Sequence, residues 1–343
     1  MLDKDDNYCY DTDVIGDQTV KKLTLWAIVT LISTASAAAD IDAKLVDIGE
    51  HSLYLHCSGE GTPTLLLDAG LGGSHLDWSL VQPALALDYR VCSYDRAGYG
   101  LSQMGPTPRD AQSLAQDLVD LLQHPQFNPE SVVLVGHSLA GFHLRLVSQQ
   151  LPERVQALVL IEAAHEDQFD EFWQRAKLRL APKRGDRIRL SPPAVPKQLK
   201  AATRERALAY ASEQKSLLTL RSELLNFSAS ADKLSQQDTR IRQPLLVISR
   251  GETQWKTSPD AELREAIWQE LQAKLVALSD KSSQLVVEHS GHFVHLEQPE
   301  RVISAIDQFT RRLHSPEMQA LSKKQPCCSD FVAATTYLNG CCQ

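Results

Sequence analysis

The sequence predicts an α/β fold in which a mostly parallel, doubly wound β-sheet is covered by helices on both faces. Short, almost entirely apolar runs at 63–69, 131–135 and 244–249 have the pattern of strands that are buried on both sides. They alternate with longer stretches whose apolar residues recur at helical spacing, as at 109–122. This alternation of buried strands with amphipathic helices is typical of a parallel sheet.

In chain order, strands are predicted at 44–47, 51–57, 63–69, 89–94, 131–135, 157–161, 244–249 and 284–288, and helices at 109–122, 142–149, 260–278 and 299–313. The alternation breaks at about residue 167, where a polar, helix-rich stretch with a proline cluster begins and continues to 243. We therefore expect a core formed by 40–162 and 244–315, with a helical insertion at 163–243.

Composition narrows the class of protein. The 343 residues are 43% hydrophobic and 23% charged, which suits a globular protein and not a disordered one. The formal net charge of −8 argues against nucleic acid or an anionic membrane as the main partner, because both require a basic surface. The sequence contains no motif for a metal or a cofactor, so we expect neither.

The N-terminal region has the pattern of a secretory signal peptide. Lys21 and Lys22 precede an apolar run at 23–32, and small residues around Ala37 and Ala39 provide cleavage sites. The alternative is an uncleaved membrane anchor at 23–39, although 17 residues are few for a spanning helix. We expect an exported protein, periplasmic or secreted.

An acidic leader at 1–19 precedes this segment and does not suit a signal peptide. We therefore expect translation to start at Val20. Residues 1–39 as given would then comprise a leader followed by a signal peptide or anchor. At the other end, 316–343 form a tail that lies outside the predicted core. The tail holds two adjacent cysteine pairs, Cys327–Cys328 and Cys341–Cys342, whose spacing does not match a zinc site.

A candidate nucleophile lies where the strand at 131–135 meets the following helix. The sequence Gly136-His137-Ser138-Leu139-Ala140-Gly141 places a serine on a tight strand-to-helix turn, with small residues two positions before and after it. Such a turn raises the serine hydroxyl above the sheet edge. Ala140 replaces the glycine of the commoner G-x-S-x-G pattern.

With two further motifs, this turn resembles the α/β-hydrolase fold serine hydrolases over 45–313. The segment 95–102 matches the family pattern D-x-x-G-x-G-x-S, and 290–300 matches S-G-H-x-x-x-x-E-x-P-E. The resemblance implies an esterase-like or lipase-like enzyme with a catalytic triad and a helical cap. It also implies that His292 is the base, although His289 and His295 lie near enough in sequence to be alternatives.

The triad acid is less clear, because the position that usually carries it holds Gln254. Two carboxylates are substitutes. Glu162 ends the strand at 157–161, where some branches of the fold place the acid, whereas Glu252 lies in the same loop as Gln254. We favour Glu162 and keep Glu252 as the alternative.

The resemblance assigns the oxyanion hole to the backbone N–H groups of Leu71 and Leu139. Leu71 belongs to the glycine-rich run 68–74, in which Ala69 replaces the histidine that many relatives have. The apolar residues of the insertion would line a pocket or, as we favour, pack the cap onto the core; they are Phe169, Phe172, Trp173, Leu217, Leu220, Leu224 and Leu225.

Cys57 and Cys92 fall on the second and fourth predicted strands, which are neighbours in this fold. They would form a disulfide after export or remain buried thiols, and the sequence does not decide between the two.

The sequence thus predicts a serine hydrolase that cleaves a carboxylic ester or related acyl bond of a small molecule through an acyl-enzyme. The alternatives are a peptidase or amidase of the proline-iminopeptidase kind, and a catalytically silent scaffold that binds a small ligand or partner.

Overall fold

The computed structural model describes residues 41–182, 186, 191–193, 195–238 and 240–313. The predictions for the leader, the signal peptide or anchor, and the C-terminal tail lie outside these residues. Eight strands form one sheet in the order β1-β2-β4-β3-β5-β6-β7-β8. The strands are β1 (Ile41–Asp47), β2 (Ser52–Ser58), β3 (Thr64–Asp68), β4 (Val91–Tyr94), β5 (Val132–His137), β6 (Val155–Ile161), β7 (Leu245–Arg250) and β8 (Ser282–Val287).

The sheet is mostly parallel, which confirms the predicted fold class. β4, β3, β5, β6, β7 and β8 pair in parallel, whereas β1 and β2 join the edge as antiparallel strands. In a parallel sheet the carboxyl ends of all the strands lie at the same end of the sheet. The ends of β3, β5, β6 and β7 therefore meet there, and each leads into a loop with a candidate site residue.

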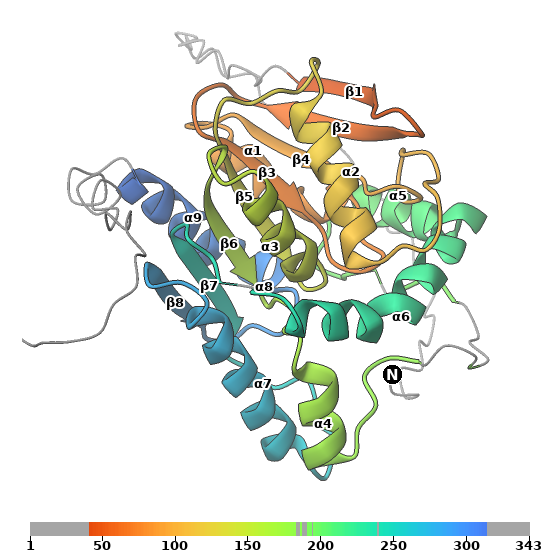
Figure 1. Cartoon of the computed structure of the whole chain (residues 1–343), viewed down its shortest axis with the longest axis vertical. Helices are drawn as coiled ribbons and strands as arrows, with labels where there is room; N and C mark the ends of the chain where they lie inside the picture. Colours follow the sequence, from red (N-terminus) through yellow and green to blue (C-terminus); the bar gives the residue numbers. More distant parts are fainter. Residues whose placement is uncertain (1–40, 183–185, 187–190, 194, 239, 314–343) are drawn as a thin grey trace, which may run out of the picture.

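Helices cover both faces of the sheet (Figure 1). α2 (Ala111–Gln123) and α3 (Ala140–Gln150) pack side by side on one face, and α7 (Ala261–Val276) extends that layer. α1 (Gln82–Leu85) and α9 (Pro299–Leu313) cover the other face. Because both faces are covered, all side chains of β3, β4, β5 and β7 are buried. This explains why these strands are continuous apolar runs in the sequence.

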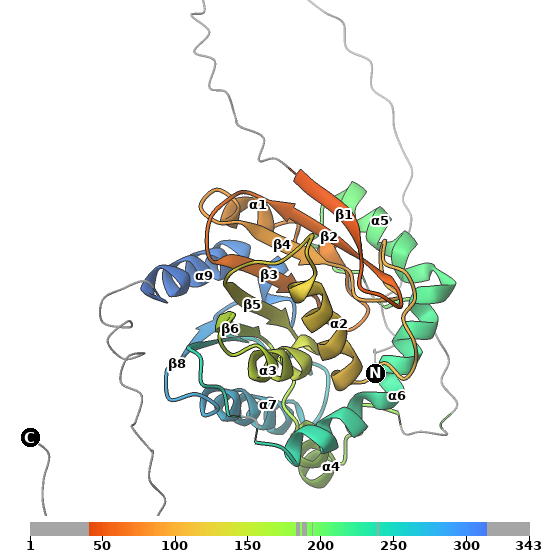
Figure 2. The same cartoon turned by 45° about the horizontal axis from the view of Figure 1, so that its top comes forward.

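The described residues between β6 and β7 form three helices, α4 (Gln168–Ala176), α5 (Ala201–Ser212) and α6 (Gln214–Ser235). α5 and α6 lie along one side of the molecule in Figure 2, whereas α4 packs against α7. Phe172 of α4 is fully buried against Ile267 and Trp268. This agrees with a packing role for most of the insertion's apolar residues, although Trp173, Leu208 and Leu218 are 52%, 51% and 43% exposed.

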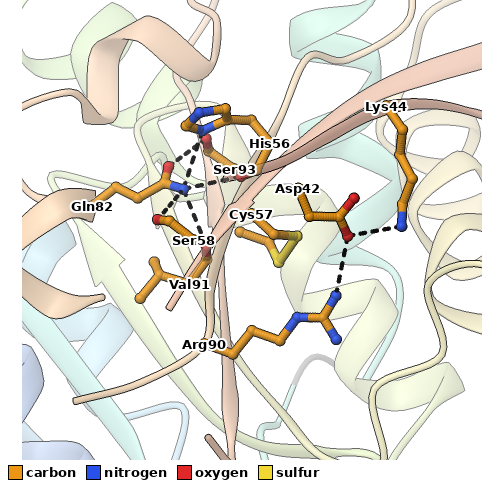
Figure 3. Close-up of a disulfide and its surroundings, with 10 residues drawn as sticks. Asp42, Lys44, His56, Cys57, Ser58, Gln82, Arg90, Val91 and Ser93 are labelled. Atoms are coloured by element: carbon orange, nitrogen blue, oxygen red, sulfur yellow. Dashed lines mark hydrogen bonds and ion pairs between the residues drawn. A yellow bond between two sulfur atoms is a disulfide. The ribbon is translucent and has the colours of Figure 1, made fainter. Parts of the chain in front are cut away.

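A disulfide joins Cys57 of β2 to Cys92 of β4 (Figure 3), which answers the question that the sequence left open. The two residues face each other in the antiparallel register. Beside the disulfide, the Gln82 side chain donates to the Val91 carbonyl at 3.1 Å and accepts from the Ser93 hydroxyl at 2.6 Å. The antiparallel edge is thus cross-linked covalently, away from the carboxyl ends of the parallel strands.

Across the described ranges, no helix combines the length and the hydropathy needed to cross a bilayer.

Candidate active site

Ser138 occupies the turn between β5 and α3 with a left-handed backbone, at φ 54°. This conformation is rare for residues other than glycine and is often found at functional sites. The turn needs small neighbours. A Cβ on Gly136 would come within 2.4 Å of Leu144 Cδ1 and 2.9 Å of Ala140 Cβ. The glycine is therefore required, and an alanine at 140 fits only because Gly136 has no side chain.

His292 lies between the serine and a carboxylate. Its Nε2 is 3.0 Å from Ser138 Oγ, and its Nδ1 is 3.3 Å from Glu162 Oε2. When Nδ1–H donates to the carboxylate, the Nε2 lone pair is free to accept the proton of the serine hydroxyl. The structure thus brings together three residues that are separated by 24 and 130 positions in the sequence.

Glu162 follows β6 and is fully buried, at φ 48°. Its Oε1 accepts from the Arg250 backbone N–H, and its Oε2 accepts from Arg250 Nη1, both at 2.8 Å. The Trp268 indole N–H lies 3.1–3.2 Å from the two oxygens. Burial raises the pKa of Glu162, but the hydrogen bond to His292 and the charge of Arg250 more than offset this, so the pKa is lowered. The residue therefore carries a negative charge toward His292 at neutral pH.

Glu252, the alternative acid, points elsewhere. Its side chain is 40% exposed, and its carboxylate binds Lys256 Nζ at 2.7 Å and faces His289 Nδ1 at 3.6 Å. The hydrogen bond and charge of Lys256 lower the pKa of Glu252. The structure therefore brings Glu162, and not Glu252, to the histidine that contacts Ser138.

The other histidines of this loop region are placed differently from His292. His289 is largely exposed beside Glu252. His295 is fully buried between Trp78 and His137, at 4.7 Å and 4.6 Å between ring centroids, and burial lowers its pKa to about 3. His137 Nε2 is 2.8 Å from the His292 carbonyl oxygen, and burial followed by the nearby His292 lowers its pKa well below the usual range. A neutral His137 donating to that carbonyl restrains the backbone that holds His292.

The two backbone groups predicted for the oxyanion hole flank the serine. Leu139 precedes the first residue of α3, and Leu71 follows Gly70 in the loop after β3. A Cβ on Gly70 would be 3.2 Å from Ser138 Cβ, so this loop lies directly against the nucleophile. Within the described part of the chain, neither the Leu71 nor the Leu139 N–H donates to another backbone carbonyl outside regular elements.

A cavity of about 320 Å³ adjoins this constellation. It is lined by His292 and Phe293, the loop 71–74, Asp77, and residues of α5 and α6 that include Ala207, Tyr210 and Ser216. The polar lining is sparse, and burial followed by the charge of Asp95 raises the pKa of Asp77 to about 7. Such a cavity admits a small, mainly apolar group next to His292, the residue that contacts Ser138.

Sequence reasoning missed the residues that hold Glu162. Arg250 ends β7 and is 1% exposed, and Trp268 lies on the buried side of α7. An arginine at the end of an apolar strand could have indicated a buried acidic partner, because arginine is almost never fully buried without one. Nothing in the sequence marks Trp268 as a partner of Glu162. No cluster of three or more histidine, cysteine or acidic side chains suited to a metal occurs among the described residues.

The family of the protein follows from comparison with known proteins. Residues 65–305 match the model of the alpha/beta hydrolase family, which is most of the chain. The chain therefore belongs to this family.

Individual relatives are more distant. The chain is 34% identical over 113 residues to "Putative carbamate hydrolase RutD" of Azorhizobium caulinodans, a match that covers 33% of this chain and 42% of that one. It is 24% identical over 253 residues to the uncharacterized protein YqjL of Bacillus subtilis, covering 73% and 85% of the two chains. As in the RutD match, the chain spans less than half the length of several other curated relatives that it matches.

Solved structures share the fold. The serine hydrolase CarC, which is involved in carbazole degradation, superposes with a TM-score of 0.57 at 20% identity, over 79% of this chain and 99% of that one. The epoxide hydrolase CorEH superposes with a TM-score of 0.60 at 17% identity, over 80% and 100%. At these identities the likeness concerns the fold alone.

Proposed function

We propose that the protein is a serine hydrolase that cleaves a carboxylic ester or a related acyl bond. The observation that carries this proposal is the chain of contacts from Ser138 Oγ to His292 Nε2 at 3.0 Å and from His292 Nδ1 to Glu162 at 3.3 Å. A serine hydroxyl becomes nucleophilic when a base within hydrogen-bond reach accepts its proton. The carboxylate then stabilises the imidazolium that forms.

The reaction follows from this geometry. Ser138 Oγ attacks the acyl carbon while its proton passes to His292 Nε2. The carbonyl oxygen takes up negative charge and accepts from the N–H groups of Leu71 and Leu139. His292 then gives its proton to the leaving alcohol, which departs and leaves an acyl group on Ser138. Water, deprotonated by His292, hydrolyses that acyl-enzyme and regenerates the serine.

The cavity supports a small substrate. Its volume of about 320 Å³ lies at the low end for ligand sites, which span about 300–1,000 Å³. We therefore propose esters with short acyl chains rather than long lipids. The disulfide supports the proposal that the protein works outside the reducing cytosol, since such bonds persist in oxidising compartments.

The test is a panel of p-nitrophenyl esters, from acetate to palmitate, with the wild-type protein and Ser138→Ala. We expect hydrolysis that is fastest for short chains and that falls by about 10⁶-fold in the variant. Cleavage of aminoacyl anilides without ester hydrolysis would favour the peptidase alternative. No hydrolysis of either class would favour the silent scaffold.

A further inference from the structure

Arg96 lies beneath the loop that carries the Leu71 N–H. It follows β4 in the segment 95–102 and is only 3% exposed. Its Nη2 donates to the Gly70 carbonyl oxygen at 2.8 Å, and its Nη1 donates to the Ala69 carbonyl and to Asp68 Oδ1. One guanidinium thus binds two successive carbonyls of the loop and the carboxylate that precedes them.

The Gly70 carbonyl accepts from Arg96 and also from the Gly73 N–H at 3.1 Å, and the two contacts together fix the direction of the Leu71 N–H. The Gly70 carbonyl and the Leu71 N–H belong to the same peptide unit, which is planar, and in a trans unit the two groups point in opposite directions. The cis peptides of the described residues precede Pro63 and Pro108, so the unit between Gly70 and Leu71 is trans. With its carbonyl bound to Arg96, this peptide must direct its N–H away from the guanidinium. Gly70 lies against Ser138, and Leu71 lines the cavity.

The other side of the guanidinium is bound by the cap. Arg96 Nε donates to Glu223 Oε1 of α6 at 3.3 Å, and the Tyr99 hydroxyl donates to Glu223 Oε2 at 2.8 Å. Lys215, also on α6, donates to the carbonyls of Gly100 and Ser102 at 2.7 Å and 2.9 Å. The segment 95–102 is therefore fixed to α6 at several points and transmits its position to the loop after β3.

We propose that Arg96 is a positioning residue for the oxyanion hole and that Glu223 couples its position to docking of the cap helix α6. This inference rests on the proposed function, because the Leu71 N–H matters to catalysis only if an oxyanion forms. Arg96 touches neither Ser138 nor His292 among the contacts described. Its effect on the reaction passes through the peptide that it orients.

The structure provides a matched control. Arg145 of α3 forms a second buried arginine–glutamate pair with Glu166, with contacts of 2.6 Å and 2.8 Å, and is 1% exposed. Arg145→Lys and Arg96→Lys both keep the charge and lose the fork of the guanidinium, so they match in the kind of structural damage. Only the second change removes a contact with the oxyanion loop.

The experiment measures kcat and KM with p-nitrophenyl butyrate, together with inhibition by a trifluoromethyl ketone, which forms an oxyanion on the serine. We expect Arg96→Lys to lower kcat about 100-fold, with KM changed less than about threefold and the ketone affinity reduced to a similar extent as kcat. Arg145→Lys keeps kcat within about threefold. Equal losses in the two variants, or a rise in KM at unchanged kcat, would overturn the proposal.

The coupling to the cap has its own pair of variants. Glu223→Gln keeps the size of the side chain but weakens its contact with Arg96, and we expect kcat to fall about tenfold while Glu166→Gln has little effect. An unchanged kcat in Glu223→Gln would remove the cap from the proposal. If the wild-type protein neither hydrolyses esters nor binds the ketone, the proposed function falls and this inference falls with it. If the wild type is active and Arg96→Lys keeps its kcat, only this inference is wrong.

Discussion

The ends of two neighbouring parallel strands, β6 and β7, each lead to a glutamate, and the two glutamates could hardly differ more. Glu162 after β6 is fully buried and accepts from the Arg250 backbone, the Arg250 guanidinium and the Trp268 indole. The side chain of Glu252 after β7 is 40% exposed and pairs with Lys256 four residues later. A buried carboxylate with several donors is held in one place and remains charged, whereas an exposed ion pair contributes little and fixes little.

This difference explains why the position of a carboxylate in the loop sequence is a poor guide to its role. An acid can orient His292 only if its own position is fixed, and the donors that fix Glu162 come from β7 and α7. The two elements pack together, so they supply a preformed set of donors at the end of β6. The end of β7 has no equivalent for Glu252 among the described contacts.

The largest expected effect separates the two glutamates directly. Glu162→Gln keeps the shape of the side chain but removes the charge, so the imidazolium is no longer stabilised, and kcat for the best ester falls about 10⁴-fold. Glu252→Gln stays within about threefold of wild type. Steady-state rates of the two variants, with circular dichroism to establish folding, check this. Similar mild losses in both would mean that neither glutamate is the acid.

Removal of the disulfide tests whether the different kcat values of Glu162→Gln and Glu252→Gln reflect chemistry rather than stability. The bond closes a loop with a sequence separation of 35 at the sheet edge. Replacement of both Cys57 and Cys92 by serine should lower the free energy of unfolding by about 3–4 kcal/mol, because the unfolded chain gains freedom. The kcat ratio between Glu162→Gln and Glu252→Gln should be the same in this background. Urea unfolding measures the loss of stability. If the kcat ratio between the two glutamate variants instead approaches one without the disulfide, the effect of Glu162→Gln depends on stability.

A third acid, Asp77, shows what burial does without strong donors. Its folded pKa is about 7, above the unfolded value near 3.8. Folding favours the protonated, neutral form of Asp77. The stability that this protonated carboxyl contributes is therefore fully present below about pH 4 and is lost as the pH rises through 7. Relative to wild type, the free energy of unfolding of Asp77→Asn should increase by about 2–3 kcal/mol as the pH is raised from 5 to 8. Urea unfolding at a series of pH values measures this difference. Glu252→Gln, a control at a side chain that is 40% exposed, should show almost no such trend. If the difference in the free energy of unfolding between Asp77→Asn and wild type does not change with pH, the raised pKa of Asp77 is wrong.

The smallest expected effect concerns one donor to Glu162. Trp268→Phe keeps the ring but removes the N–H, and should cost about 1.5 kcal/mol of stability and lower kcat by a few-fold. Trp255→Phe is the control, since Trp255 stacks over Arg250 without donating to Glu162 in the described structure. Denaturant unfolding and ester hydrolysis measure both. If the two variants behave alike, the indole N–H is not part of what holds the acid.

Much of the fold could be predicted because each buried strand is an apolar run. The run at 131–135 became β5 and the run at 244–249 became β7, with shifts of one or two residues at the ends. The insertion could only be described as helical. The apolar face of a helix shows that it packs, but not against what, so the packing of α4 against α7 could not be foreseen.

The candidate site divides in the same way. Ser138 and His292 lie in local motifs whose turn chemistry can be read directly, and the structure brings them together. The choice of acid could not be made from sequence, because it depends on burial and on Arg250 and Trp268, which lie 88 and 106 residues away from Glu162. Arg96 was visible within the 95–102 motif, but its contact with Gly70 exists only once β3 and β4 are paired.

The most direct test of the central claim, that Glu162 acts through His292 on Ser138, needs no knowledge of the substrate. It is the rate of covalent labelling of Ser138 by a fluorophosphonate, followed by intact-protein mass spectrometry in wild type, Glu162→Gln and Glu252→Gln. We predict one adduct on Ser138, formed at the wild-type rate in Glu252→Gln and about 10³-fold or more slower in Glu162→Gln. Labelling that is slow in Glu252→Gln and unchanged in Glu162→Gln would contradict it.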